Sequence, residues 1–225
     1  YFRTYFNLGI NYNKADQFDK AIDSYRKAIE YSPNNADVYY NLGNSLSNKG
    51  NLPDAVKSFK KCLEIEPKFA KAYNNIGRIF QDLGELNTAI ENYKKCLELM
   101  PTAYPALNNM GNAYYEKGLV KLAKKNYERA LLIKPDYLNA LWNLSGIAES
   151  TNEAKKYLKK CIEIDENHLL AKFTLAALKY YDGDENDLLA FKDSNFHRHS
   201  MLRSFFWVTN LPHLPALHFN RWKFF

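Results

Sequence analysis

Asparagine recurs every 34 residues in the first part of the chain. Asn7, Asn41, Asn75 and Asn109 each stand directly before an apolar residue and a glycine. A side-chain amide has one acceptor oxygen and two N–H donors, so regularly spaced amides could pair with the backbone of an extended peptide, whatever its side chains. Alternatively, each amide could bond to the neighbouring unit or to solvent. The sequence leaves both roles open.

The 34-residue unit places its apolar residues at helical spacing. In the unit 36–69, Tyr39, Leu42, Gly43 and Leu46 form one stripe on a first helix, and a second helix follows with its own stripe. Glycine is predicted to end the first helix in three units and proline to end the second in four, namely at Gly50, Gly84 and Gly118 and at Pro33, Pro67, Pro101 and Pro135. No unit can bury its stripe alone, so neighbouring units must stack.

This pattern resembles the tetratricopeptide repeat, a helix–turn–helix unit of 34 residues, and the resemblance runs without a gap over 2–137. It implies an all-α fold, a right-handed superhelical solenoid of antiparallel helix pairs. We expect five repeats over 2–168, followed by a partial sixth unit or capping helix at 169–190 and an aromatic, basic tail or linker at 191–225. The five units are 2–35, 36–69, 70–103, 104–137 and 138–168.

The fifth unit departs from the pattern. Ser145 replaces the glycine of the first helix. Ala154, which corresponds to the alanine of the second helix, stands three residues earlier than in the other units, so we expect a shortened turn. Leu158 takes the place that an aromatic residue holds in the earlier units.

The resemblance also implies a binding surface, because in this family the side of the first helix opposite the core stripe lines a concave groove. An asparagine row of this kind is similar to the one in the repeat arms of O-linked N-acetylglucosamine transferases, where it holds substrate peptides. We predict that Asn41, Asn75 and Asn109 face this groove. The full predicted peptide-binding set is Asn7, Tyr40, Asn41, Asn44, Lys71, Asn74, Asn75, Arg78, Asn108, Asn109, Asn112, Trp142 and Asn143.

A different type of member clamps a terminal carboxylate with lysine, arginine and asparagine. Here only Lys71 and Asn44 match that arrangement, which argues against a carboxylate clamp. Lys71 and Arg78 could instead favour an acidic or polar peptide, or could simply be solvated charges.

Composition narrows the class of function. The 225 residues are 46% hydrophobic and 25% charged, typical of a folded chain, and no apolar run is long enough to span a membrane. Of the net charge of +6, residues 191–225 carry +4, from five Lys/Arg and one Asp, and the other 190 residues carry +2. This balance argues against a nucleic-acid partner for the main body. We expect a protein or peptide partner, no membrane and a cytoplasmic location.

No phosphate-binding glycine loop, metal-ligand cluster or catalytic triad is present, so we expect no enzyme activity, cofactor or metal site in this chain. The three cysteines, Cys62, Cys96 and Cys161, stand where other units have alanine, which predicts buried, reduced thiols. The main hypothesis is a scaffold that binds an extended peptide or a partner protein. The alternative is the substrate-recruiting arm of a larger glycosyltransferase or methyltransferase.

The segment 191–225 contains nine aromatic residues and four of the five histidines. We predict that Phe205, Phe206 or Trp207 packs near residues 170–178; self-association through the tail and a linker to a transferase domain are the alternatives. Pro212 and Pro215 argue against one continuous helix in the tail.

Overall fold

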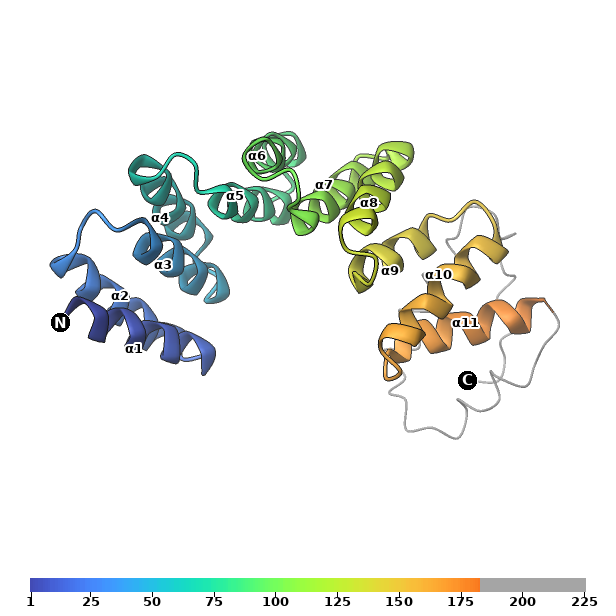
Figure 1. Cartoon of the computed structure of the whole chain (residues 1–225), viewed down its shortest axis with the longest axis horizontal. Helices are drawn as coiled ribbons and strands as arrows, with labels where there is room; N and C mark the ends of the chain where they lie inside the picture. The colour runs from blue at the N-terminus through green and yellow to red at the C-terminus, as the bar shows by residue number, and fades with distance from the viewer. Residues whose placement is uncertain (183–225) are drawn as a thin grey trace. The chain divides into compact units, whose positions relative to one another are not determined.

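The computed structural model of the protein describes residues 1–182, and in this range it contains eleven α-helices and no strand (Figure 1). The predicted all-α class is therefore confirmed. The helices are α1 (Phe2–Lys14), α2 (Phe18–Tyr31), α3 (Ala36–Asn48), α4 (Leu52–Ile65), α5 (Ala70–Asp82), α6 (Leu86–Leu99), α7 (Tyr104–Glu116), α8 (Val120–Ile133), α9 (Leu138–Gly146), α10 (Thr151–Ile164) and α11 (Leu169–Tyr181). The predictions for Phe205, Phe206 and Trp207 lie outside the described residues.

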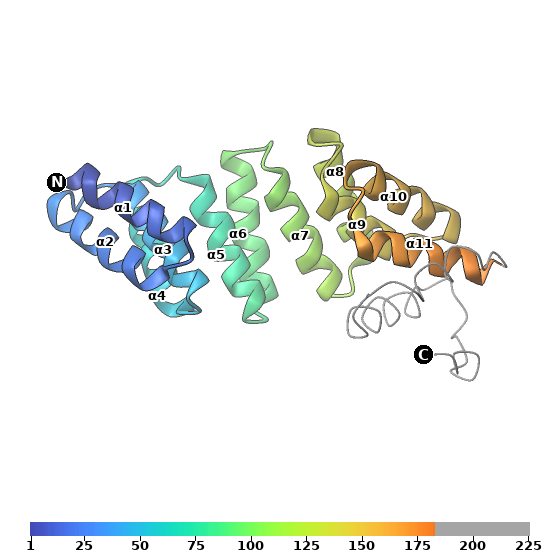
Figure 2. The same ribbon diagram turned by 90° about the horizontal axis from the view of Figure 1, so that it is seen from below.

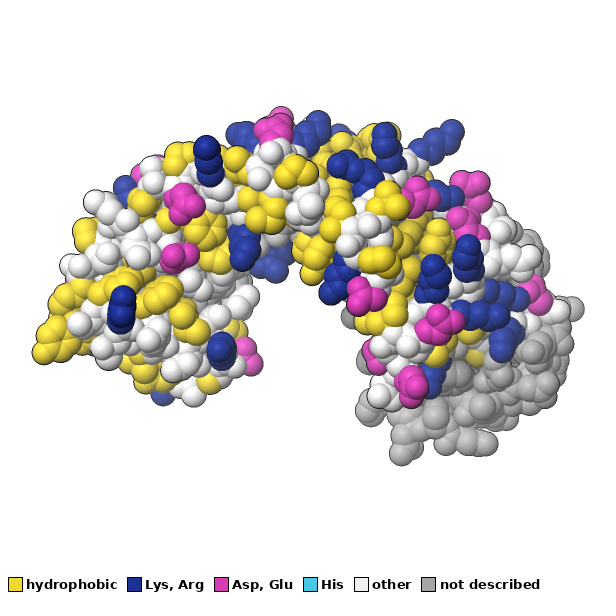
Figure 3. All heavy atoms as spheres, in the orientation of Figure 1, with side chains coloured by type: hydrophobic (Ala, Val, Ile, Leu, Met, Phe, Trp, Pro, Cys, Tyr) yellow, Lys and Arg dark blue, Asp and Glu magenta, His cyan; other side chains and the backbone are white. Residues whose placement is uncertain are grey.

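The chain divides into two compact units, one from Tyr1 to Gly118 and one that begins at Leu119. In the first unit α1 pairs antiparallel with α2, α3 with α4 and α5 with α6, and each pair packs on the next (Figures 1 and 2). In the second unit α9 pairs with α10, while α8 packs on α9 and α11 packs on α10. On the face drawn in Figure 3, basic and acidic side chains are interspersed with hydrophobic ones along the described helices.

Turns with a left-handed backbone separate the first helix of a pair from the second. Gly50, Gly84 and Gly118 have φ of +88°, +77° and +75°, a region that glycine enters at no steric cost. The first pair reaches the same conformation at Asp16, with φ of +54°. The glycine turns expected from the sequence are thus present, and Asp16 is a turn residue that the sequence pattern did not indicate.

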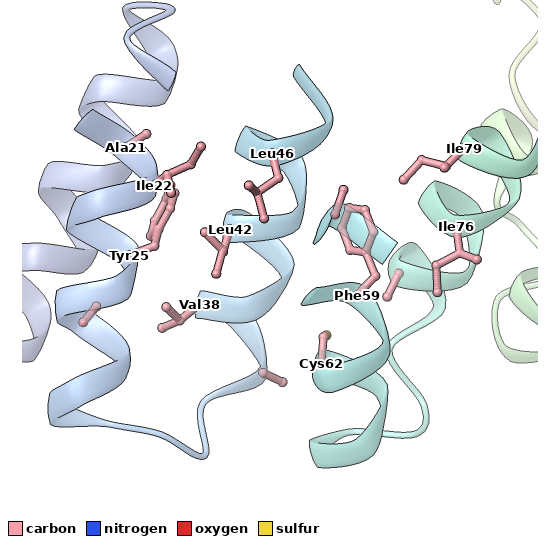
Figure 4. Close-up of a cluster of buried hydrophobic side chains, with 14 residues drawn as sticks. Ala21, Ile22, Tyr25, Val38, Leu42, Leu46, Phe59, Cys62, Ile76 and Ile79 are labelled. Carbon is pink, nitrogen blue, oxygen red and sulfur yellow. The ribbon is translucent and has the colours of Figure 1, made fainter. Parts of the chain in front are cut away.

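The core lies between successive helices, as Figure 4 shows for α2 to α5. Val38 and Leu42 of α3 point toward Ile22 and Tyr25 of α2, and all four side chains are buried. Val38 lies outside the predicted stripe, because the stripe accounted for packing within a pair but not for the face turned to the preceding pair. Leu8, which corresponds to Leu42, is 37% exposed because no described helix packs on that side of α1.

Candidate functional site

The candidate site lies on the first helix of each pair, on the side next to the stripe of residues that is buried in the core. In α3, α5 and α7 this side carries asparagine at the position just before the buried apolar residue and glycine. The helix period of 3.6 residues puts Asn41 and Asn44 on the same side of α3, one turn apart. The three helices all belong to the first compact unit.

Hydrogen bonds connect these asparagines from helix to helix. Asn75 of α5 donates through Nδ2 to Asn44 Oδ1 of α3 at 2.7 Å and to Tyr40 Oη at 3.4 Å. Asn109 of α7 donates through Nδ2 to Asn74 Oδ1 of α5 at 3.1 Å, and Asn74 Nδ2 donates to Asn75 Oδ1 at 3.3 Å. We call these five side chains, Tyr40, Asn44, Asn74, Asn75 and Asn109, the amide network.

All five side chains of the amide network are half-buried, so each is in contact with both protein and solvent. The amides of Asn75 and Asn109 donate to acceptors on the neighbouring helix, which fixes the orientation of these two side chains. Oxygen atoms keep a second lone pair when they accept one hydrogen bond. The network therefore presents acceptor oxygens whose orientation the protein itself fixes, and its hydrogen bonds between helices correspond to the structural role.

The other predicted asparagines have different surroundings. Asn7 is exposed on α1, and Asn41 donates through Nδ2 to Asp37 O of its own helix at 2.8 Å. Asn108 is only 3% exposed, so it presents little surface to a ligand. Asn112 is half-buried on α7, and Asn143 is half-buried on α9 in the second compact unit.

Aromatic rings border the amide network at one end. The Tyr40 ring lies 4.9 Å from the Phe69 ring and 5.8 Å from the Phe59 ring, measured between centroids. Phe69 was missed in the sequence because it stands in the loop before α5, outside the helical pattern. Trp142 of the second unit has a similar neighbour, the His168 ring at 5.5 Å.

Charges of both signs lie near the network. Lys71 and Arg78 are exposed on α5, and neither forms a salt bridge with any residue in the described range 1–182. Asp37 and Asp82 are exposed on α3 and α5. The surface around the network therefore carries both basic side chains, Lys71 and Arg78, and acidic ones, Asp37 and Asp82.

Two polar contacts between helices were not expected from the sequence. Ser45, fully buried on α3, donates to Asn13 Oδ1 of α1 at 2.9 Å. Tyr93 Oη donates to Gln81 Oε1 at 2.8 Å, and burial together with the nearby Asp82 carboxylate raises the pKa of Tyr93. The recurrence of Asn, Ser and Gln on the first helices was the available signal for such contacts.

The three cysteines are free and buried, which confirms the prediction for their location. Burial raises the pKa of the Cys62 thiol to about 12 and those of Cys96 and Cys161 to about 11, so none is an activated nucleophile. Within residues 1–182 no three His, Cys, Asp or Glu side chains come together as metal ligands would. No helix in the described part of the chain has the length and apolarity needed to cross a bilayer.

Family models for the tetratricopeptide repeat match most of the described chain. Their matches cover 11–50 and 77–118, 36–69, 58–91, and 104–137 with 148–168. No significant match was found among curated protein sequences.

Several solved structures are similar to this one. The crystal structure of MamA has 29% sequence identity and a TM-score of 0.61, with 72% of this chain and 96% of MamA covered. PilW, a widely conserved type IV pilus biogenesis factor, has 21% identity and a TM-score of 0.78, with 91% and 98% covered. YrrB, a repeat protein of the same family with an unusual peptide-binding site, has 22% identity and a TM-score of 0.56, with 74% and 88% covered.

Proposed function

The chain belongs to the tetratricopeptide repeat family, and from this premise we propose that it is a protein-interaction module that binds an extended peptide along α3, α5 and α7. Arrays of this family are typical of scaffolds rather than enzymes. YrrB, whose structure is described with a peptide-binding site, is a precedent for peptide binding by this fold.

The amide network is the observation that carries the proposal. A ligand backbone has one N–H and one C=O per residue, and half-buried amides at the spacing of successive helices can pair with those groups. Because Asn75 and Asn109 are already held by Asn44 and Asn74, less side-chain entropy is lost when a peptide binds. Each new hydrogen bond would contribute about 0.5–1.5 kcal/mol.

The side chains around the network suggest the composition of the peptide. Tyr40 and Phe69 would accept an apolar side chain of the ligand, and Lys71 and Arg78 would favour a carboxylate beside it. Asn7, Asn41, Asn108, Asn112, Trp142 and Asn143 remain part of the proposed binding set, with Asn108 contributing least because it is buried.

To test the proposal, unstructured peptides of about 12 residues are selected from a random library on the full chain. The best peptide is then titrated into the wild type and into Asn44→Ala/Asn75→Ala/Asn109→Ala, well below both melting temperatures. We expect the triple variant to bind at least tenfold more weakly. Asn92→Ala is the matched control, since the Asn92 amide lies outside the proposed binding set and donates to Thr88 O of its own helix α6, and it should bind within about twofold of wild type.

The opposite outcome assigns the network to folding alone. In that case the triple variant would lose melting temperature and keep the affinity of the wild type. Failure to select any peptide on the folded chain would likewise count against the proposal.

A transferase arm is the second candidate function. The sequence pattern suggests it, because the asparagine row resembles the row in the repeat arms of O-linked N-acetylglucosamine transferases. The peptide would bind in the same way, and the array would present it to a catalytic domain. The test is the coding sequence that follows Phe225: a glycosyltransferase or methyltransferase domain would support this role, and a stop codon would exclude it.

A further inference from the structure

The helix α8 has an apolar outer surface where the corresponding helices are polar. Leu119, Leu122 and Leu132 are 42%, 42% and 84% exposed. One repeat earlier, on and just before α6, the same positions hold Glu85, Thr88 and Glu98. The corresponding residues of the first two repeats are also polar, namely Gln17, Lys20 and Glu30, and Asn51, Asp54 and Glu64.

The earlier repeats act as internal controls for these positions. The helices α2, α4, α6 and α8 all have 14 residues and the same repeat register, so the repeat pattern does not require leucine there. Single exposed leucines are common on protein surfaces, but leucine in place of a polar residue at three positions, one just before α8 and two on it, is a consistent change.

The same helix is also the most basic of the second helices in the four regular pairs. Within Val120–Ile133, α8 has four Lys/Arg and one acid, a net charge of +3, whereas Leu86–Leu99 of α6 has two Lys and two Glu, a net charge of zero. Lys124 is neutralised by Glu149 at 3.2 Å and Glu153 at 3.0 Å. Lys121, Lys125 and Arg129 are exposed and form no salt bridge in the part of the chain that the structure describes.

Leucines and cations share one side of α8. Leu122, Lys125, Arg129 and Leu132 are separated by three, four and three residues, which is the spacing of a single stripe on a helix. Ala123, Tyr127 and Ala130 are buried on the opposite side. At 1.5 Å per residue the two leucines are about 15 Å apart, with the two cations between them. Hydrophobic and basic side chains lie side by side over this part of the surface in Figure 3.

We propose that this outer stripe of α8 is a second docking surface, and that it binds an acidic amphipathic helix of a partner protein. Leucines at the two ends of the stripe would contact apolar residues of that helix, and glutamate or aspartate between them would meet Lys125 and Arg129. Charge complementarity favours an acidic helix over a second copy of this chain. Two copies of α8 facing each other would place like positive charges together.

The probe is a labelled helical peptide of about 16 residues with leucines at the spacing of the stripe and glutamates between them, titrated into the full chain by fluorescence anisotropy. Leu119→Glu/Leu122→Thr/Leu132→Glu transplants the residues found one repeat earlier, so the variant should fold. We expect it to bind at least tenfold more weakly than wild type. Lys125→Glu should weaken binding about threefold to tenfold, and Lys94→Glu, the same charge change on α6, should have no effect.

Three results would overturn the proposal. The first is equal binding of the acidic peptide and a version with lysine in place of glutamate, or no binding of either. The second is binding to vesicles of phosphatidylcholine and phosphatidylserine without binding to the peptide, which would identify a membrane surface. The third is a concentration-dependent dimer that the leucine transplant dissociates. The asparagine variants of the amide network should leave peptide binding to α8 unchanged, so the two sites can fail independently.

Discussion

The pairs α3–α4 and α9–α10 solve the same packing problem with different residues. In α3–α4 the helices meet at Gly43, and a Cβ placed there would lie 2.7 Å from the Phe59 ring. In α9–α10 the corresponding residues are Ser145 and Leu158, both fully buried, and the Ser145 hydroxyl donates to Trp142 O at 2.6 Å. The smaller Leu158 leaves room for the Ser145 side chain, so the glycine and the aromatic ring act as one coupled pair.

The two pairs also differ in length. The first helix has 13 residues in α3 and nine in α9, which ends at Gly146. Ile147 and Ala148 are buried beyond the end of α9, and Ser150 accepts a hydrogen bond from Glu153 N to begin α10. A shorter first helix therefore still covers its partner, but it has fewer turns with which to do so.

Breaking the coupled pair should have the largest effect. Gly43→Ala is expected to destabilise the protein by about 1–3 kcal/mol, because the added methyl group overlaps the Phe59 ring and this outweighs the gain of roughly 1 kcal/mol in helix propensity. Urea denaturation of the full chain measures the change. Gly43→Ser/Phe59→Leu reproduces the residues of α9–α10. We expect this double variant to lose less stability than the summed losses of its two single variants. A double variant that loses more than that sum would contradict the coupling.

The buried thiols allow the two pairs to be compared by reactivity. Cys62 of α4 and Cys161 of α10 occupy equivalent positions, and both should resist a bulky thiol reagent in the native state. Because α9 is shorter than α3, local opening should expose Cys161 first, and we expect it to be labelled several-fold faster than Cys62. Mass spectrometry of labelled peptides gives the two rates. Faster labelling of Cys62 would show that helix length does not determine local stability here.

The same thiols predict a loss of stability at high pH. Burial raises their pKa from about 9 to about 11 or 12, so the folded state favours the neutral form. This contribution is complete below about pH 9 and is lost as the pH rises toward the folded pKa, by at most about 1.4 kcal/mol per pH unit for each thiol. Melting temperatures between pH 8 and about 10.5 test the trend, and replacing all three cysteines by alanine should make it shallower. An unchanged slope would point to the buried tyrosines instead.

A tyrosine and a phenylalanine at equivalent positions of neighbouring pairs provide a smaller test. The Tyr25 hydroxyl is buried and has no hydrogen-bond partner among the described residues, and burial raises its pKa to about 12, whereas α4 has Phe59 at this place. Tyr25→Phe should therefore stabilise the protein by about 1 kcal/mol. Tyr93→Phe is the matched control and should destabilise by a similar amount, because it removes the hydrogen bond to Gln81. Thermal melts of both variants decide the matter; a loss of stability in Tyr25→Phe would mean that the hydroxyl has a partner in solution.

The turns provide the smallest expected change. Asp16 adopts the left-handed conformation that glycine occupies in the next three pairs, and relief of this strain should let Asp16→Gly stabilise the protein by about 0.5 kcal/mol. Gly50→Ala makes the opposite change and should cost about 1 kcal/mol. Chemical denaturation at neutral pH resolves differences of this size when the two variants are measured together. Equal stability of both variants and wild type would show that the turn conformation carries no strain.

The helical fold could be predicted well because its signals are local. Proline at Pro67 and glycine at Gly50 end helices for reasons of backbone geometry, and the helical spacing of Leu42 and Leu46 defines a buried side within one helix. Packing against the preceding pair was harder to predict: Val38 and the exposed Leu8 differ from expectation because their surroundings depend on which helix lies next to them. Residues beyond 182 fall outside what the structure describes, so the predictions for the tail stay predictions.

The sequence by itself determined that asparagines recur on one side of the first helices, because a 34-residue period and the helix repeat are properties of the chain alone. Only the tertiary structure decided what each amide does. Asn75 reaches Asn44, whereas Asn41, at the same position one repeat earlier, bonds to its own helix at Asp37. A hydrogen bond tolerates only a few tenths of an ångström, and the distance between side chains of neighbouring helices depends on how closely and at what rotation those helices pack. Identical residues at identical positions in the repeat can therefore have different partners.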